Sequence, residues 1–231
     1  MRVVLQALLL AALAPNAFAE APARKMITVV TADWEATTGE LRRWERAGKS
    51  WRQVGAVVPV VVGRKGLWWA EAKREGDLSS PAGRFALGDV TGYDEKPPRG
   101  LKLRYRWADH LVCDDDPDDR EYNRVIEGRA DESRGEEAKP YEKMHRDDEL
   151  YRFTIFVRHN PERRPGNGSC IFLHVWRGAN SPTVGCTAMA LEDLRALLLW
   201  VDRKTILVQL PSDQYDKRQR EWDLPPLVQR K

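Results

Sequence analysis

Apolar and polar positions alternate in short runs along most of the chain, and glycine or proline separates one run from the next. Short runs of β-branched and aromatic residues between such breaks are typical of strands. Strands at this density indicate a mainly β domain. We predict them in the runs at residues 25–34, 57–62, 67–70, 83–88, 151–159, 170–176 and 205–210.

Two hairpins and one helix are expected among these runs. Trp44 and Trp51 flank the turn residues 47–49 (Ala-Gly-Lys), which predicts a hairpin over residues 39–55. The runs at 151–159 and 170–176 are joined by a loop rich in glycine and proline, so they are expected to form a second hairpin. The helix is indicated by apolar residues at helical spacing, namely Leu191, Leu194, Leu197, Leu198 and Val201.

Residues 113–149 interrupt this pattern, because they are highly charged and poor in apolar side chains. We expect a long surface loop there. The polar residues 213–231 are expected to form a loose C-terminal tail. The chain has neither an internal repeat nor a clear linker, so residues 20–212 are expected to form a single domain.

The N-terminus has the features of a secretory signal peptide. Arg2 supplies a positive charge, residues 3–13 are apolar apart from Gln6, and residues 17–19 (Ala-Phe-Ala) form a small-x-small cleavage site. The apolar core of about 11 residues is shorter than the roughly 20 needed to span a bilayer. We therefore predict a signal peptide at residues 1–19, and a mature protein that is secreted or periplasmic and has no membrane span.

The charge of the chain bears on whether it binds nucleic acid. Charged residues make up 32% of the chain, but their signs are mixed and the formal net charge is only +3. Binding to nucleic acid would favour runs of Lys and Arg interleaved with aromatic residues, and the sequence has no such run. We therefore expect no nucleic-acid partner, and we expect the protein to be a monomer.

Cys186 is the residue that most suggests chemistry. It directly follows Gly185, and His174 lies twelve positions upstream, near the end of a predicted strand. The intervening loop is long enough to bring thiol and imidazole together, so that the imidazole takes the thiol proton and the thiolate attacks a carbonyl. Gly185 permits a tight turn, from which backbone amides can face a developing oxyanion. The alternative is a buried structural cysteine.

Two segments carry a resemblance to a known family. FLHVWRGANSPTVGCTAM, residues 172–189, resembles the active-site segment of the YkuD-type L,D-transpeptidase catalytic domain, in which a His and a loop precede Ser/Thr-x-Gly-Cys. KREGDLSSPAGRFALG, residues 73–88, is similar to the upstream signature of that family. The resemblance extends over roughly residues 55–210 and implies a YkuD-like β-sandwich with one helix after the nucleophile.

The resemblance implies an enzyme that acts on peptidoglycan stem peptides. The nucleophile Cys186, with His174 as its base, would attack the carbonyl between a diamino acid and a terminal D-amino acid. The acyl-enzyme would then pass to an amine or to water, and no cofactor is required. No metal is expected either, because the four histidines lack metal-ligand spacing. Two alternatives stay open: a peptidoglycan carboxypeptidase or amidase on the same fold, and a non-catalytic wall-binding module.

Departures from the family pattern bear on substrate binding. Val184 and Ala188 stand where many members have a His and an Arg. Without that Arg, Arg177 is the nearest cation for a substrate carboxylate, unless it forms a surface ion pair instead. Thr183 and His159 are further candidates for substrate binding. Their alternative roles are to shape the loop and to end a strand, respectively.

The chain has three cysteines, so in an exported protein one of them stays free or pairs with another molecule. The sequence does not determine which two pair within the chain. Because Cys186 is the candidate nucleophile, we favour a disulfide between Cys113 and Cys170.

Overall fold

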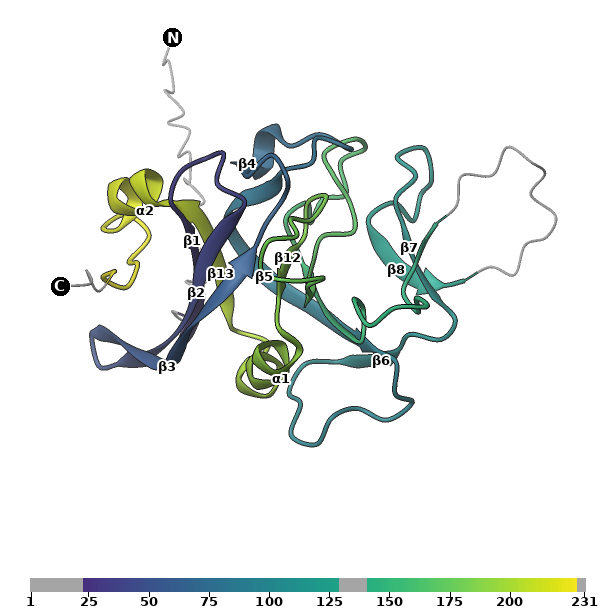
Figure 1. Cartoon of the computed structure of the whole chain (residues 1–231), viewed down its shortest axis with the longest axis horizontal. Helices are drawn as coiled ribbons and strands as arrows, with labels where there is room; N and C mark the ends of the chain where they lie inside the picture. The colour runs from purple at the N-terminus through teal and green to yellow at the C-terminus, as the bar shows by residue number, and fades with distance from the viewer. Residues whose placement is uncertain (1–22, 129–140, 228–231) are drawn as a thin grey trace, which may run out of the picture.

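The computed structural model describes residues 23–128 and 141–227. The predicted signal peptide, residues 1–19, and residues 129–140 of the predicted surface loop lie outside the described residues. The described chain consists mainly of strands, with two short α-helices and one 3-10 turn (Figure 1). These are α1 (Leu191–Trp200), α2 (Ser212–Arg218) and the turn Ala70–Ala72.

Eight strands form a ring, so that the main sheet closes on itself. β10 pairs with both β11 and β5, which closes the order β10-β11-β12-β3-β2-β1-β13-β5. Two short strands, β4 (Leu67–Trp69) and β6 (Tyr105–Trp107), pair with β5 outside the ring. The ring strands are β1 (Lys25–Thr31), β2 (Thr38–Ala47), β3 (Ser50–Val61), β5 (Ser80–Gly92), β10 (Phe153–Val157), β11 (Phe172–Val175), β12 (Thr187–Met189) and β13 (Ile206–Pro211).

The expected mainly β fold is confirmed. Ile27, Val90 and Leu173, on three different strands of the ring, are fully buried in one apolar core. The expected helix after Cys186 is also confirmed as α1, which packs against β10 and β11 through Leu194 and Leu197. The core thus extends from inside the sheet to the buried face of this helix, as the helical spacing of the leucines requires.

Both predicted hairpins are present. β2 and β3 pair antiparallel out to Ala47 and Ser50, so Gly48 and Lys49 form the two-residue turn. Gly48 has a φ of +63°, which favours glycine at this position. β10 and β11 also pair antiparallel, with Ile155 opposite Leu173.

The expectation of a plain surface loop at 113–149 is wrong for the part of it that the structure describes. Three strands, β7 (Leu111–Asp114), β8 (Arg124–Glu127) and β9 (Glu142–Lys143), form a second, small sheet. Tyr122 and Met144 are buried, although their neighbours in the sequence are charged. We refer to the described residues 111–128 and 141–150 as the insert, which lies to one side of the main sheet (Figure 1).

The expectation of a loose C-terminal tail is also wrong for residues 213–227. They include most of α2, whose Tyr215 is fully buried and whose phenol donates a hydrogen bond to the carbonyl of Pro225, 2.8 Å away. Leu224 is buried in the same core. A few apolar side chains in a polar stretch therefore hold this segment against the domain.

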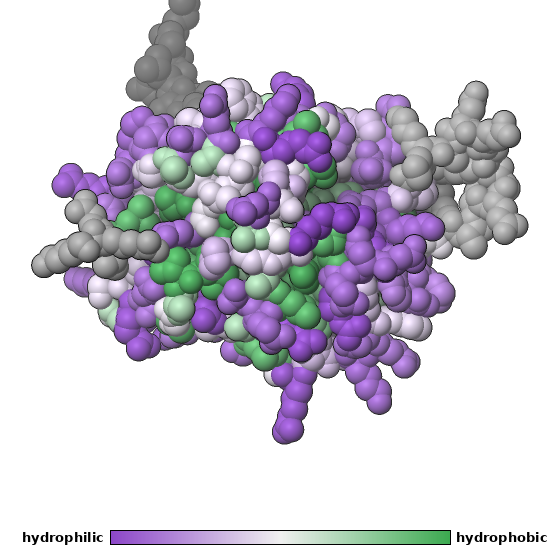
Figure 2. Space-filling view, in the orientation of Figure 1, coloured by the Kyte–Doolittle hydropathy of each residue, from purple (hydrophilic) through white to green (hydrophobic). Residues whose placement is uncertain are grey.

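The surface is mostly hydrophilic around its edge, and apolar residues show near the middle of the face in Figure 2. Neither α1 nor α2 has the length and apolar character that a membrane-spanning helix needs, and the same holds for the rest of the described chain.

Candidate functional site

A cavity of about 530 Å³ lies where the main sheet meets the insert. Its walls come from segments far apart in the sequence: residues 73–78, the insert, the start and end of β11, and residues 181–188. Cys186, His174 and Gly185 all line it, together with Arg177 and Thr183. The structure therefore brings five of the six residues singled out from the sequence into one cavity.

Cys186 and His174 are brought together by the pairing of β11 with β12. In this parallel pair His174 lies opposite Ala188, two residues after Cys186. Both side chains are buried, with 6% and 7% of their surface exposed, and both reach the cavity. This register places Cys186, just before β12, diagonally across from His174 on the neighbouring strand, so both side chains open into the same cavity.

The Cys186 thiol is held in a defined position. The amide of Phe172 donates a hydrogen bond to Sγ at 3.3 Å, and the thiol itself donates to the carbonyl of Cys170 at 3.6 Å. Burial, together with the nearby Glu142 carboxylate, raises the pKa of the thiol to about 12. The Phe172 amide and the Lys73 ammonium act in the opposite direction. The resting thiol is therefore protonated at neutral pH.

The His174 imidazole is uncharged at the same pH. Nδ1 lies 2.7 Å from the carbonyl of Val175 and donates to it, which leaves Nε2 as the proton acceptor. Burial lowers the pKa of His174 to about 4. The edge of the ring faces Tyr151, with the centroids 5.2 Å apart, and this contact fixes its orientation.

The turn before Cys186 is braced by two hydroxyl groups. Thr183 Oγ1 and Ser80 Oγ both donate hydrogen bonds to the carbonyl of Cys186, at 2.6 and 2.8 Å. Thr183 Oγ1 also accepts the amide of Gly185 at 3.1 Å. Gly185 itself has a φ of +154°, which L side chains rarely adopt. Thr183 thus lines the cavity and also shapes the loop, the second of the two roles weighed from the sequence.

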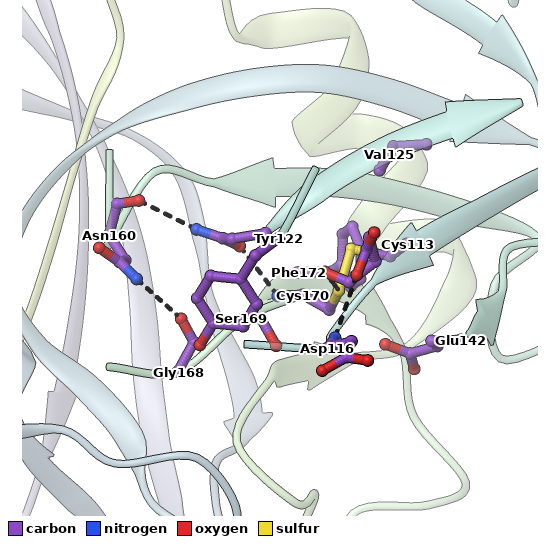
Figure 3. The surroundings of a disulfide bond; sticks show 12 residues. Cys113, Asp116, Tyr122, Val125, Glu142, Asn160, Gly168, Ser169, Cys170 and Phe172 are labelled. Carbon is purple, nitrogen blue, oxygen red and sulfur yellow. Dashed lines mark hydrogen bonds between the residues drawn. A yellow bond between two sulfur atoms is a disulfide. The ribbon is translucent and has the colours of Figure 1, made fainter. Parts of the chain in front are cut away.

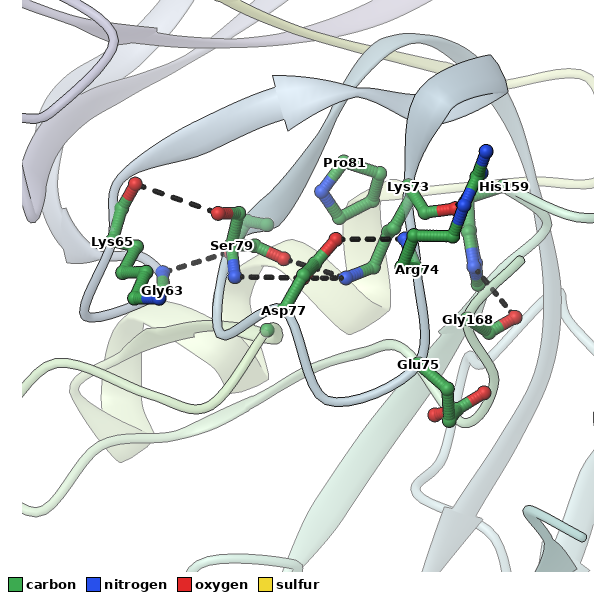
Figure 4. A network of polar contacts seen from close by, with 12 residues as sticks. Gly63, Lys65, Lys73, Arg74, Glu75, Asp77, Ser79, Pro81, His159 and Gly168 are labelled. Carbon is green, nitrogen blue, oxygen red and sulfur yellow. Dashed lines mark hydrogen bonds and ion pairs between the residues drawn. The ribbon is translucent and has the colours of Figure 1, made fainter. Parts of the chain in front are cut away.

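Lys73 is a residue of the cavity that the sequence analysis does not assign to the site (Figure 4). Its side chain is buried, and Nζ donates to Asp77 Oδ1 at 2.7 Å and to the carbonyl of Ser79 at 2.8 Å. A Cβ on Gly185 would lie 3.8 Å from this ammonium. The signal was available, because Lys73 is the first residue of the upstream signature.

Glu142 and Tyr151 form the other part of the site that sequence reasoning missed. Tyr151 is buried, its hydroxyl donates a hydrogen bond to Glu142 Oε1, and it also lies close enough to the Cys186 thiol to interact with it. Burial, together with the charges of Asp115 and Glu75, raises the pKa of Glu142 to about 7. The phenol of Tyr151 and the guanidinium of Arg146 oppose this shift. No pattern in the charged stretch distinguishes Glu142 from its neighbours.

Two cations stand at the mouth of the cavity. Arg177 has 65% of its side chain exposed and lies 3.6 Å from Asp148 Oδ2. Arg146 bonds to both oxygens of the same carboxylate, and its guanidinium lies over the Tyr151 ring, 5.2 Å from the centroid. Arg177 thus forms the surface ion pair that was its alternative role, and both arginines share the Asp148 carboxylate.

His159 is the one candidate that does not line the cavity. It is buried, and its Nε2 lies 3.1 Å from the carbonyl of Gly168 (Figure 4). Burial, together with the charge of Lys73, lowers the pKa of His159 to about 4. The side chain packs behind Gly168 and is placed to support the cavity wall rather than to touch a ligand.

The favoured disulfide between Cys113 and Cys170 is confirmed, and Cys186 is the free cysteine (Figure 3). The bond joins Cys113 on β7 of the insert to Cys170. The carbonyl of Cys170 accepts the hydrogen bond from the Cys186 thiol. Asn123 adds to this connection, because its Oδ1 accepts the amide of Cys170 at 3.0 Å and its Nδ2 donates to Asn160. The insert is thus anchored directly beside the thiol.

The described residues, 23–128 and 141–227, contain no group of three or more His, Cys, Asp or Glu side chains placed to hold a metal ion. What the cavity does contain is a thiol, an imidazole that can accept a proton, a backbone donor to the thiol, and arginine side chains. This set suits attack of sulfur on the carbonyl of a ligand that carries a carboxylate.

Comparisons with known proteins give a family and one related structure. A family model described as YkuD, the L,D-transpeptidase catalytic domain, matches residues 30–210. Among solved structures, the chain is similar to the helical cell shape determining protein Pgp2 from Campylobacter jejuni, with 14% identity and a TM-score of 0.39. That match covers 80% of this chain and 46% of the other, so the chain spans less than half the length of that structure. No curated protein matches the sequence.

Proposed function

The chain belongs to the YkuD family of L,D-transpeptidase catalytic domains, since the family match spans residues 30–210, and we propose that it is an exported cysteine acyltransferase acting on peptidoglycan stem peptides. The observation that carries the proposal is the presence of Cys186 and His174, from a turn and a neighbouring strand, in one cavity. A substrate of this kind would place the enzyme in the cell envelope.

In the first step Cys186 attacks the carbonyl that precedes a terminal D-amino acid. The resting thiol and imidazole are both neutral, because burial disfavours either charge. The thiol proton therefore moves to Nε2 of His174 as the sulfur–carbon bond forms. The carbon–nitrogen bond then breaks, and His174 returns the proton to the leaving amine. The Phe172 amide, which faces Sγ, stabilises negative charge on the sulfur during this transfer.

In the second step an acceptor takes the acyl group from Cys186. An amine from a neighbouring stem peptide gives a crosslink, and water gives a shortened stem peptide. His174 removes a proton from either acceptor and passes it to the departing thiolate. A carboxypeptidase or amidase would use the same acyl-enzyme and differ only in the acceptor. The low exposure of Cys186, 6% of its surface, favours the transfer reaction, because restricted access of water limits hydrolysis.

The test is intact-mass spectrometry of the mature protein with a purified tetrapeptide stem, with and without an amine acceptor. We expect an acyl adduct on the protein and a crosslinked peptide product, and neither with Cys186→Ala. A shortened peptide and free D-amino acid alone would favour the hydrolase. If wild type gives neither adduct nor product, Cys186 does not react with this substrate. The result would then favour the alternative of a non-catalytic wall-binding module.

We further propose that Arg177 and Arg146 bind the carboxylate of the terminal D-amino acid. Both arginines line the cavity. A hydrogen bond between an arginine and the substrate carboxylate should contribute roughly 1.5–3 kcal/mol to the free energy of substrate binding. Replacing either residue, as Arg177→Ala or Arg146→Gln, should raise KM about tenfold with little change in kcat. Arg99→Gln, at an exposed position outside the cavity lining, is the control. An unchanged KM in both variants would exclude this role.

A further inference from the structure

Trp68 is an unusually exposed tryptophan close to the candidate site. It belongs to β4, where Leu67 before it is buried and Trp69 after it packs against the core. Trp68 itself has 52% of its surface exposed. A large aromatic side chain facing water is informative, because burial of such a ring is strongly favourable when a partner is available.

The orientation of Trp68 is set by a neighbouring tryptophan. Trp34 lies edge-on between two rings, with its centroid 6.3 Å from that of Trp68 and 5.1 Å from that of Trp69. The segment that carries Trp34 is fixed to β4 by a hydrogen bond from the amide of Leu67 to the carbonyl of Trp34, 2.8 Å long. Contact with Trp34 therefore holds the exposed Trp68 ring in position, so the ring is already placed to bind a ligand.

Trp68 lines a second cavity, of about 590 Å³, which we call the tryptophan cavity. Trp34 and Trp68 provide its aromatic surface, and charged side chains surround them. Figure 4 shows three residues of this wall, Lys65, Arg74 and Asp77, on two loops that a hydrogen bond from Ser79 to the carbonyl of Lys65 connects. Glu35 adds a further acceptor. An aromatic face bordered by both donors and acceptors suits a ligand with an apolar face and polar edges.

The tryptophan cavity adjoins the catalytic cavity. Arg64 lines both of them, and its amide bonds to the carbonyl of Thr183, 2.9 Å away. The loop that contributes Asp77 to one cavity also places Lys73 in the other. A polymer whose peptide branch enters the catalytic cavity would thus have its main chain within reach of Trp68.

We propose that the tryptophan cavity binds the glycan strand of peptidoglycan, with Trp68 stacked on the carbon–hydrogen face of a sugar ring. The identity of the polymer rests on the proposed function. Each pyranose ring has an apolar face that fits an indole, and its hydroxyl and acetamido groups match the donors Lys65 and Arg74 and the acceptors Glu35 and Asp77. Arg64, at the junction, then marks the boundary between the glycan and the peptide.

The test measures binding of peptide-free glycan strands to the full mature chain by isothermal titration calorimetry. Trp68→Ala should weaken this binding about tenfold, as expected for loss of a central tryptophan contact. Trp68→Phe, which keeps an aromatic face, should retain most of the affinity. The matched control is Trp107→Ala, because Trp107 is 42% exposed on β6 and lies outside both cavities.

Three outcomes would overturn the proposal: wild-type protein that does not bind the peptide-free glycan, Trp68→Ala that binds it as tightly as wild type, or an equal loss in Trp107→Ala. Melting curves of each variant establish that the fold is retained. The proposed function is tested separately by acyl-adduct formation with the soluble tetrapeptide, which has no glycan. Failure of that reaction with intact glycan binding would reject the enzyme and keep the binding site.

Discussion

Gly185 holds the backbone just before the nucleophile in a conformation with a φ of +154°. A Cβ there would lie 3.1 Å from Ile171 Cδ1 and 3.4 Å from the carbonyl of Ser79. A side chain at this position would therefore be strained by the backbone conformation and would sit tightly against Ile171. This geometry, rather than a helix N-terminus, sets the position of Cys186, because α1 begins five residues later at Leu191.

We predict that Gly185→Ala lowers both stability and activity. The strained backbone should cost about 1–3 kcal/mol of unfolding free energy, and the shifted turn should lower kcat/KM by at least about tenfold. Gly100→Ala is the control, since Gly100 also has a positive φ, of +90°, but has no atom near its Cβ position. It should lose stability and keep activity, measured by urea melts and peptide turnover. Wild-type turnover by Gly185→Ala would contradict the prediction.

At the scale of single residues, Glu142 makes the stability of the protein depend on pH. Its pKa in the folded protein is about 7, above the ordinary value of 4.5, because burial disfavours the carboxylate. The folded state therefore binds this proton more tightly than the unfolded state does. The contribution of Glu142 to stability falls as pH rises from 4.5 to 7 and stays constant above that.

It follows that Glu142→Gln should melt at a higher temperature than wild type at pH 8, and at nearly the same temperature at pH 5. The amide oxygen can still accept the hydrogen bond from Tyr151, so the fold of the site is kept. Melting curves from pH 4 to pH 9 measure the difference. A difference that is independent of pH would show that Glu142 does not titrate in this range.

At the scale of elements, the insert is joined to the catalytic segment by the bond between Cys113 and Cys170, which closes a loop with a sequence separation of 57. Cys170 also provides the carbonyl that accepts the Cys186 thiol. The insert contributes Glu142 and Arg146 to the cavity. An element without any apolar periodicity is thus held in place by one covalent bond and a few buried side chains.

We predict that the double variant Cys113→Ala, Cys170→Ala loses up to about 4 kcal/mol of stability, the value that loop-closure entropy gives for this separation. Peptide turnover should fall at the same time, because the backbone that holds the thiol loses its anchor. Urea unfolding and turnover assays measure both effects. Dithiothreitol treatment of wild type should reproduce them, and equal activity with the disulfide reduced or intact would contradict this role.

At the scale of the whole molecule, the two ends of the described chain meet in the same sheet. β1 pairs in parallel with β13, and α2 continues directly from β13 and packs against β1 and β13. Tyr215 on α2 is fully buried. The C-terminal segment therefore completes the core of the domain, although its composition is polar.

Tyr215→Ala should accordingly destabilise the protein by about 3–5 kcal/mol, the usual cost of deleting a buried aromatic ring. Tyr215→Phe keeps the ring and removes the hydroxyl with its hydrogen bonds to Pro225 and Thr28, which should cost about 1 kcal/mol. Denaturant melts compare the two variants. A loss of less than about 1 kcal/mol in Tyr215→Ala would mean that the segment is held by other contacts.

Several features were determined by the sequence alone, because each depends on residues close together in the chain. Alternating apolar positions specified the strands, Gly48 marked the first hairpin turn, and leucine spacing specified α1. The segments around His174 and Cys186 identified the family without any coordinates. The pairing of Cys113 with Cys170 followed once Cys186 had been set aside as the candidate nucleophile.

Only the tertiary structure decided which distant segments share the cavity. Alternation specifies the two faces of a strand but not its partner, so the closure of the ring by β10 and β5 could not be read from the pattern. Glu142 and Tyr151 join the site for the same reason, since long-range packing places a charged stretch beside Cys186. The C-terminal tail was misread because its apolar residues are too few to form a periodic pattern, yet Tyr215 and Leu224 are buried in the core and Trp222 packs against it.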